Sequence, residues 1–264
     1  MDYTGITFKK NDGIATITFN RTDAANGLDM DTTISFMNAA VDCSEDSSIR
    51  AVILTGAGDR FFSAGGDLKA FTSMGDQVAQ GVKLMTMYLH QAVSRLTRMN
   101  APLICAVNGV AAGAGVSLAA MGDLVIAKES ASFTLAYTNG GLSPDGSSTY
   151  FLPRVIGMRR TQELMITNRK LSAQEALDWG LVTKVVGDDD LSEEVQKLAE
   201  RLAKGPTQAY GGVKSLLAET FSSGLEHQME AEARTIARLI SGEDAQEGMR
   251  AFAAKERPNY KGQS

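Results

Sequence analysis

Apolar residues in the N-terminal half of the chain fall into short runs that end at glycine or at another turn-forming residue. Residues 6–9 and 14–19 alternate between apolar and polar on either side of Asn11-Asp12-Gly13, and this pattern predicts a β-hairpin. Uninterrupted apolar runs are typical of strands buried on both faces of a sheet. Further strands are predicted at residues 50–55, 103–107, 124–127 and 132–136.

Between these strands, apolar residues recur with the spacing of three and four that predicts helices with one buried face. The predicted helix at residues 77–98 has such a face, formed by Met85, Leu89, Val93 and Leu96. His90 lies on the adjoining face of that helix. An earlier helix is predicted to run to about Cys43, with Asp29 or Asp31 as its N-cap.

The C-terminal part of the chain shows only the helical spacing. Ser172 and Glu175 have the spacing of a capping box, and Gly180 is expected to end the helix that they begin. From Leu191 onward we find helical stripes and no strand pattern. We therefore divide the chain into an α/β core at residues 1–190 and an all-helical segment at residues 191–264.

The least polar stretch runs from Met99 to Gly122 and carries no charged residue. Its turn residues, Pro102, Asn108-Gly109, Gly113 and Gly115, argue against a membrane helix. They divide it into a buried strand and a buried helix, the latter predicted at residues 112–121. The first N–H groups of that helix lack partners within it and are suited to hold an anion, including one that forms only during a reaction; the simpler alternative is a plain core element.

Composition narrows the class of protein. The 264 residues suffice for a full core, and the net charge of −5 argues against nucleic acid as a partner. Cys43 and Cys105 lie far apart in sequence, and the first residues lack a basic stretch followed by an apolar one. We therefore expect free thiols and a cytoplasmic location. With two histidines and no Cys/His cluster, no metal site is expected.

Two glycine clusters fail the dinucleotide-binding pattern, because no third glycine follows at the required spacing. The segment Phe61 to Lys69 is too rich in glycine for regular structure and is predicted to be a loop. Residues 138–148 combine turn formers over a length that is typical of a functional loop.

Two motifs in these regions resemble the crotonase (enoyl-CoA hydratase/isomerase) superfamily. They are Phe62-Ser63-Ala64-Gly65-Gly66-Asp67-Leu68 and Asn108-Gly109-Val110-Ala111-Ala112-Gly113-Ala114-Gly115. The resemblance extends over nearly the whole chain through Asn26-Gly27-Leu28, the segment 171–182 and Phe252 to Pro258. It implies a crotonase-like spiral of ββα turns, closed by C-terminal helices that assemble homotrimers or dimers of trimers.

The same resemblance implies an acyl-CoA thioester as substrate and no cofactor beyond the coenzyme A that the substrate carries. The backbone N–H groups of Gly66 and Ala114 match the family's oxyanion hole. By the same resemblance, the family's contacts to the adenine and pantetheine parts of coenzyme A fall on Ala64, Gly65, Asp67, Leu68 and Lys69. Tyr137 is expected to line the acyl site. Lys255 or Arg257 match the contacts to the phosphates, from this chain or from a neighbouring subunit.

The family's hydratases use two glutamates, and Ser117 and Tyr137 stand at the matching positions. Neither side chain is a general base at neutral pH, so simple hydration is not expected. A carboxylate is instead present at Asp145, where the family's isomerases and one dehalogenase branch place an aspartate. An aspartate beside the acyl group could move a proton along it, although Ser-Pro-Asp-Gly is also ordinary turn chemistry.

The dehalogenase branch, which acts on 4-chlorobenzoyl-CoA, offers an alternative. There an aspartate attacks the aromatic carbon and a histidine activates the water that hydrolyses the ester; Asp145 and His90 match these roles. Tyr137, however, replaces the tryptophan that orients the aspartate, and Gly66 and Leu89 replace aromatic residues of the ring pocket. A lone helical histidine is also more often a packed or surface residue.

We therefore predict an acyl-CoA isomerase in which Asp145 shuttles a proton while two amides stabilise the enolate. The first alternative is a dehalogenase-like hydrolase that uses Asp145 and His90. The second is a CoA-ester-binding scaffold that has lost its chemistry together with the glutamates.

Overall fold

The computed structural model describes residues 3–262, and its strands form two sheets. The larger sheet has the order β1-β2-β3-β5-β7-β10, and the smaller has the order β4-β6-β8-β9. The strands are β1 (Ile6–Asn11), β2 (Ile14–Phe19), β3 (Ala51–Gly56), β4 (Phe61–Ser63), β5 (Leu103–Val107), β6 (Val110–Ala112), β7 (Leu124–Lys128), β8 (Ser132–Thr134), β9 (Leu171–Ser172) and β10 (Lys184–Val186).

Successive strands alternate between the two sheets. Strands β3, β5 and β7 pair in parallel in the larger sheet, and the strand that follows each of them, β4, β6 or β8, pairs in parallel in the smaller one. A helix then returns the chain to the next turn. The result is a spiral of ββα turns, preceded by the predicted hairpin of β1 and β2.

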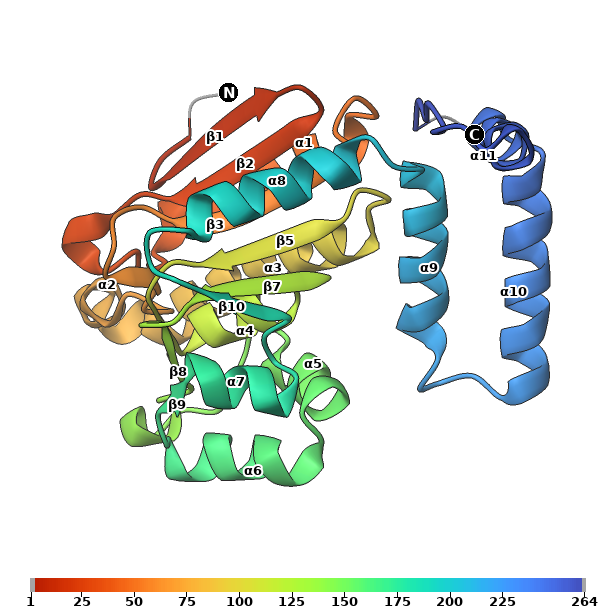
Figure 1. The fold of residues 1–264 in the computed structure, drawn as a ribbon. Coiled ribbons are helices and arrows are strands. Elements are labelled where there is room, and N and C mark those ends of the chain that lie inside the picture. The colour runs from red at the N-terminus through yellow and green to blue at the C-terminus, as the bar shows by residue number, and fades with distance from the viewer. Residues whose placement is uncertain (1–2, 263–264) are drawn as a thin grey trace.

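The apolar runs are buried because both faces of the larger sheet are covered. In β3, Val52 and Leu54 pack into one apolar cluster and Ile53 packs into another. Helices α1 (Met30–Glu45) and α3 (Val78–Arg98) cover the first face, and α8 (Leu191–Ala203) covers the second (Figure 1). A parallel strand with two covered faces is expected to be apolar throughout, which explains the uninterrupted runs.

The helices outside the C-terminal arm are α1 (Met30–Glu45), α2 (Leu68–Ser73), α3 (Val78–Arg98), α4 (Ala114–Ala120), α5 (Ser148–Val155), α6 (Met158–Thr167), α7 (Ala173–Trp179) and α8 (Leu191–Ala203). Of the two candidate caps, Asp29 begins α1 by accepting a hydrogen bond from the N–H of Thr32 at 2.9 Å. The capping box of Ser172 and Glu175 is present, and Gly180 ends α7. In the part of the chain described here, no helix is both long and apolar enough to cross a membrane.

The last helices form an arm that projects from the core (Figure 1). They are α9 (Thr207–Glu219), α10 (Leu225–Ile240) and α11 (Glu243–Ala254). Helix α8 was expected to belong to this helical segment, but Leu191, Val195 and Ala199 pack on the larger sheet. The arm therefore begins at α9, not at residue 191.

Three segments differ from their predicted structure. Residues 61–69 are not one loop, because β4 pairs with β6 and Asp67 caps α2. The helix expected from residue 112 starts at Ala114, since Val110–Ala112 is a strand between β4 and β8. The predicted loop at 138–148 contains the 3₁₀ turn η3 (Thr138–Gly140) and the first residue of α5.

An ion pair between a buried lysine and a partly exposed aspartate links α9 to the core. The Nζ atom of Lys214 lies 2.7 Å from Oδ2 of Asp123 and donates to the carbonyl oxygens of Leu96 and Ala101. The Asp123 carboxylate also accepts from the N–H of Leu103 at 2.7 Å. Only 8% of the Lys214 side chain is exposed, so the position of the arm depends on these contacts.

We predict that Lys214→Met lowers the free energy of unfolding by roughly 1 to 3 kcal/mol, because it removes the buried ammonium group that pairs with Asp123 and donates to the carbonyl oxygens of Leu96 and Ala101. Urea unfolding of both proteins at equal concentration measures the change. Lys10→Met is the control, since the Lys10–Asp46 pair is half exposed and is expected to contribute less than about 1 kcal/mol. A loss at position 214 no larger than in the control would contradict the anchoring role.

Candidate active site

The principal candidate site is a cavity of about 570 Å³ beside the smaller sheet. Five segments enclose it: residues 28–33 at the start of α1, the loop at residues 64–68 with the start of α2, the inward face of α3, the start of α4, and residues 135–145. Most of the side chains on its wall are apolar. Both predicted oxyanion residues, Gly66 and Ala114, and the predicted carboxylate, Asp145, lie on this wall. The spiral thus brings together three residues that are far apart in sequence.

The amide groups of Gly66 and Ala114 are available to a ligand. Among the hydrogen bonds of residues 3–262, neither N–H donates to an acceptor. The two loops touch, because a methyl group at Gly65 would lie 2.7 Å from the Ala114 nitrogen. A pair of free N–H groups on one cavity wall is suited to bind a carbonyl oxygen, and to bind it more strongly as negative charge develops there.

Backbone pairing with Leu28 sets the orientation of Gly66. The N–H of Leu28 donates to the Gly65 carbonyl at 2.7 Å, and the N–H of Asp67 donates to the Leu28 carbonyl at 2.8 Å. In a parallel bridge of this kind, the residue between the two bonded groups directs its own N–H to the opposite side. The bridge between Leu28 and Gly66 therefore leaves the Gly66 N–H turned away from residue 28.

Buried side chains hold the same loop from beneath. The Asn26 amide donates to the carbonyl oxygens of Ala57 and Phe61 at 3.0 and 2.8 Å. The Ser63 hydroxyl donates to the Asn26 carbonyl at 2.9 Å and accepts from the Gly65 N–H at 3.1 Å. Because Asn26 and Ser63 are almost fully buried, loss of either would leave unpaired polar groups.

The side chain of Asp67 has a structural role. It accepts from the N–H groups of Lys69 and Ala70 at 3.0 and 3.2 Å and so caps α2, and it pairs with Arg21 at 2.9 Å. Partial burial alone would raise the pKa of this carboxyl, but the Ala70 N–H and the Arg21 guanidinium hold it below the ordinary value. Only the backbone of Asp67 remains for the predicted contact with coenzyme A.

Tyr137 orients the Asp145 carboxylate. Its hydroxyl donates to Oδ1 of Asp145 at 2.6 Å, and the buried Ser117 hydroxyl donates to the Asp145 carbonyl at 2.8 Å. Tyr137 replaces the tryptophan that orients the aspartate in the dehalogenase branch. Its phenol nevertheless supplies a hydrogen-bond donor to the Asp145 carboxylate.

The phenol of Tyr137 stays protonated over the ordinary pH range. Burial raises its pKa above the usual value, and the negative charge of Asp145 and the hydrogen bond to that carboxylate raise it further. Ionisation would place two negative charges within hydrogen-bonding distance of each other. Tyr137 therefore acts as a fixed donor and is not a base.

His90 lies outside the principal cavity. It is exposed on α3 and lines a second cavity of about 930 Å³ between the core and α9. Asp145 lines both cavities, so it separates the space that contains the two amides from the space that contains His90. The structure thus places Asp145 with the oxyanion amides on one side and with His90 on the other.

The remaining predicted residues divide into two groups. Ala64 and Leu68 line the principal cavity, and Lys69 is exposed at the start of α2. Lys255 ends α11 in the left-handed conformation, and Arg257 is exposed shortly after it. Figure 1 shows α11 at the far side of the molecule from α2. Within one chain, the structure does not bring Lys255 and Arg257 to the site.

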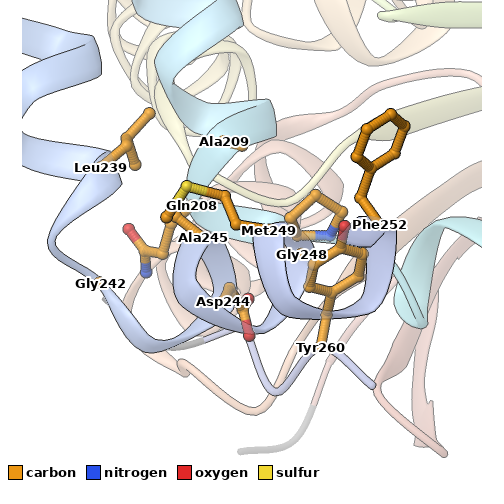
Figure 2. A pocket seen from close by; sticks show the side chains of 11 residues that line it. Gln208, Ala209, Leu239, Gly242, Asp244, Ala245, Gly248, Met249, Phe252 and Tyr260 are labelled. Atoms are coloured by element: carbon orange, nitrogen blue, oxygen red, sulfur yellow. The ribbon is translucent and has the colours of Figure 1, made fainter. Parts of the chain in front are cut away.

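A third cavity, of about 360 Å³, lies where the helices of the arm meet (Figure 2). Met249, Phe252 and Tyr260 form part of its wall. Among residues 3–262, the one carboxylate on its wall belongs to Asp244, which accepts from the N–H groups of Lys261 and Gly262 at 2.6 and 2.8 Å. Because these contacts hold the C-terminal segment against α11, we assign Asp244 a structural role.

Sequence reasoning missed Arg21 and the helix α2. Arg21 pairs with Asp29 and Asp67 and donates to the Gly27 carbonyl, which ties three segments together. Phe71 lies in a segment that was expected to be irregular and to shape the acyl pocket, and it lines the cavity from α2, whose first two residues were predicted to belong to a loop. Asp67 is a good N-cap residue, and its position before Leu68-Lys69-Ala70-Phe71 was a signal for this helix.

Comparisons with known proteins agree with this geometry. A family model described as enoyl-CoA hydratase/isomerase matches residues 9–263. The 1,2-epoxyphenylacetyl-CoA isomerase of Escherichia coli (strain K12) is 38% identical over 95% of this chain and 95% of its own length. A 4-chlorobenzoyl coenzyme A dehalogenase of Arthrobacter sp is 33% identical over 95% of this chain and 91% of its own.

A solved structure has the same arrangement of elements. The crystal structure of an enoyl-CoA hydratase from Bacillus anthracis superposes with a TM-score of 0.92 and 33% sequence identity. The alignment covers 98% of this chain and 100% of that chain. The likeness therefore includes the C-terminal arm as well as the spiral.

We predict that Tyr137→Phe makes stability less sensitive to alkaline pH. Above about pH 10, the unfolded wild-type chain releases the phenol proton while the folded chain retains it, so the free energy of unfolding falls as pH rises. The variant lacks this contribution. The slope of the free energy of unfolding against pH should therefore differ between the two proteins by up to roughly 1.4 kcal/mol per pH unit. Urea unfolding at a series of alkaline pH values measures both slopes. Equal slopes would contradict the placement of Tyr137 beside Asp145.

Proposed function

This chain belongs to the enoyl-CoA hydratase/isomerase family, the crotonase superfamily that its motifs and its spiral of ββα turns indicated, and we propose that it is an acyl-CoA isomerase. The observation that carries the proposal is the shared cavity of two free amides and one oriented carboxylate. Support also comes from the E. coli relative, which is itself named as an isomerase of a CoA ester.

In the proposed reaction, the thioester oxygen accepts hydrogen bonds from the N–H groups of Gly66 and Ala114. Removal of a proton beside the thioester carbonyl moves negative charge onto that oxygen, and the amides then bind it more strongly. One donor of this kind lowers a barrier by roughly 3 to 4 kcal/mol in other enzymes. The enolate thereby becomes accessible without a metal in the proposed step.

Asp145 carries the proton. From a 3-enoyl thioester, its carboxylate takes a proton from C2, and the electron pair delocalises over the double bond and the thioester carbonyl. Return of the proton at C4 leaves the double bond between C2 and C3, in conjugation with the carbonyl. The hydrogen bond from Tyr137 directs Oδ1, so the carboxylate keeps one orientation during both transfers.

The cavity lacks the second carboxylate that water addition would use. Asp145 is the only acidic residue among the described residues on its wall. Ser117 and Tyr137, which match the glutamates of the family's hydratases, both direct hydrogen bonds to Asp145. These residues support the aspartate, and this arrangement favours proton transfer within the acyl group over hydration.

We extend the proposal to the assembly that completes the site. Exposed apolar residues follow α10 with a helical spacing: Leu225, Met229, Ile236 and Ile240. An apolar stripe of this length on a projecting arm is typical of an interface. In a homotrimer or a dimer of trimers, the arm could bring Lys255 and Arg257 to the coenzyme A phosphates of a neighbouring subunit.

A second candidate is hydrolysis through an Asp145 ester, as in the dehalogenase branch. One observation favours it: Asp145 and His90 line the same second cavity, in which His90 could activate water. The hydrogen bond from Tyr137 to the aspartate is compatible with this chemistry too. The experiments below separate the two candidates, and binding of acyl-CoA without turnover would instead indicate the scaffold alternative.

We predict that the purified protein converts a 3-enoyl-CoA into the conjugated 2-enoyl-CoA and that Asp145→Asn lowers kcat by roughly 10²- to 10⁴-fold. The amide keeps the shape of the carboxylate but cannot accept the proton. Absorbance of the conjugated thioester follows the reaction, and calorimetry measures the affinity for the CoA ester. That affinity should change by less than tenfold, about 1.4 kcal/mol.

Asp59→Asn is the matched control, because that carboxylate is exposed and lies outside the cavity. It should retain wild-type kcat. Full activity of Asp145→Asn would assign the proton transfer to another group and so reject the proposed mechanism.

We predict that His90→Gln changes the kcat for 3-enoyl-CoA by less than roughly tenfold, because the proposed proton transfer uses Asp145 alone. The wild-type protein should release little chloride from 4-chlorobenzoyl-CoA. Chloride release that is lost in both His90→Gln and Asp145→Ala would favour the ester mechanism instead. Chloride measurement and the absorbance assay on the same preparations decide between them.

A further inference from the structure

Phe71 occupies the space beside Gly66 that a side chain at position 66 would fill. A methyl group at Gly66 would lie 2.6 Å from Cζ and 2.8 Å from Cε2 of the Phe71 ring. Real Cβ atoms do not approach other atoms this closely, so the ring and a side chain at Gly66 exclude each other. The edge of an aromatic ring therefore stands directly against one of the two oxyanion residues.

We propose that Phe71 is a specificity-determining residue and that it selects acyl groups carrying an aromatic ring close to the thioester. This inference rests on the proposed acyl-CoA site and names its substrate class. Gly66 and Leu89 replace aromatic residues of the dehalogenase branch, which led us to expect poor binding of an aryl group. The proposal departs from that expectation, because Phe71 brings an aromatic ring to the wall from a different position in the chain.

The local structure holds the backbone that carries Phe71 in place. Asp67 caps α2 through the N–H groups of Lys69 and Ala70, and its carbonyl accepts from the N–H of Phe71 at 3.0 Å. Arg21 holds the Asp67 carboxylate from the other side. The contacts that fix the oxyanion loop thus also fix the start of the helix that carries Phe71.

The rest of the wall suits an aryl group. Tyr137 adds a second aromatic ring, and Met85 and Leu89 add buried apolar surface from α3. Pairs of aromatic rings are stabilised by roughly 0.5 to 1.5 kcal/mol beyond the effect of their buried area, and a thioether beside a ring adds a contact of similar size. These interactions require an aromatic ligand and are lost with a saturated ring of equal size.

Phenylacetyl-CoA and cyclohexylacetyl-CoA are matched probes for this selection, because they have the same number of carbon atoms and differ in the aromaticity of the ring. Calorimetry gives the ratio of their dissociation constants without any turnover. We predict that Phe71→Leu shifts this ratio against phenylacetyl-CoA by about 2- to 10-fold. Comparing the ratio between two proteins cancels the intrinsic difference in hydrophobicity of the probes.

Three further variants test the mechanism of the shift. Phe71→Tyr retains the ring and should retain the wild-type ratio. Phe8→Leu removes a half-buried ring that contacts Tyr3 outside the cavity, so it should also leave the ratio unchanged. Gly66→Ala should shift the ratio in the same direction by displacing the ring, and should have no further effect when Phe71 is already leucine.

The outcomes separate this inference from the proposed function. If Phe71→Leu weakens both probes equally or neither of them, the aromatic selection is wrong even where 3-enoyl-CoA is converted. If the ratio shifts as predicted while no isomerisation occurs, the aromatic wall stands and the isomerase proposal fails. Circular dichroism of each variant checks that the fold is retained. The ratio of dissociation constants in Phe71→Tyr is the control for a substitution at position 71 that keeps the aromatic ring.

Discussion

The orientation of one backbone N–H group, that of Gly66, is the constraint on which the site depends. A glycine has no side chain with which to anchor itself, so its neighbours must hold it. Leu28 pairs with the backbone on either side of Gly66, and Asn26 and Ser63 support the loop through buried hydrogen bonds. The N-terminal segment before α1 therefore belongs to the active site, although it contributes no reactive group.

The same constraint explains why glycine is required next to Gly66. Gly65 has a φ of +84°, and a methyl group there would lie 2.7 Å from both the Ala112 carbonyl oxygen and the Ala114 nitrogen. A side chain would therefore be strained and would also force the two oxyanion loops apart. Ala114 carries a methyl group without such a clash, because its side chain is buried in the core and its N–H group is left without an acceptor.

Much of the fold could be predicted from the sequence, because apolar runs and helical stripes report burial directly. The prediction failed where a contact distant in sequence decides the structure. Phe61–Ser63 is a strand only because β6 lies beside it. Helix α8 belongs to the core because it covers the second face of the larger sheet, which would otherwise be exposed. The motifs indicated Gly66, Ala114 and Asp145, but no local pattern could show that the Tyr137 phenol faces Asp145 or that Phe71 fills the space beside Gly66.

The site combines two backbone N–H groups with one acidic side chain, and different parts of the structure hold them. The two amides that we propose as oxyanion donors belong to the backbone, and the residues around Gly66 hold them in position. The proposed acid-base group is a side chain on a separate loop. Ser117 lies on α4 three residues after Ala114, and its hydroxyl supports the backbone of Asp145 on a separate loop. In the proposed function, an aspartate on that loop replaces a helix-borne glutamate, so the proton is transferred from a different position while the same two amides bind the thioester.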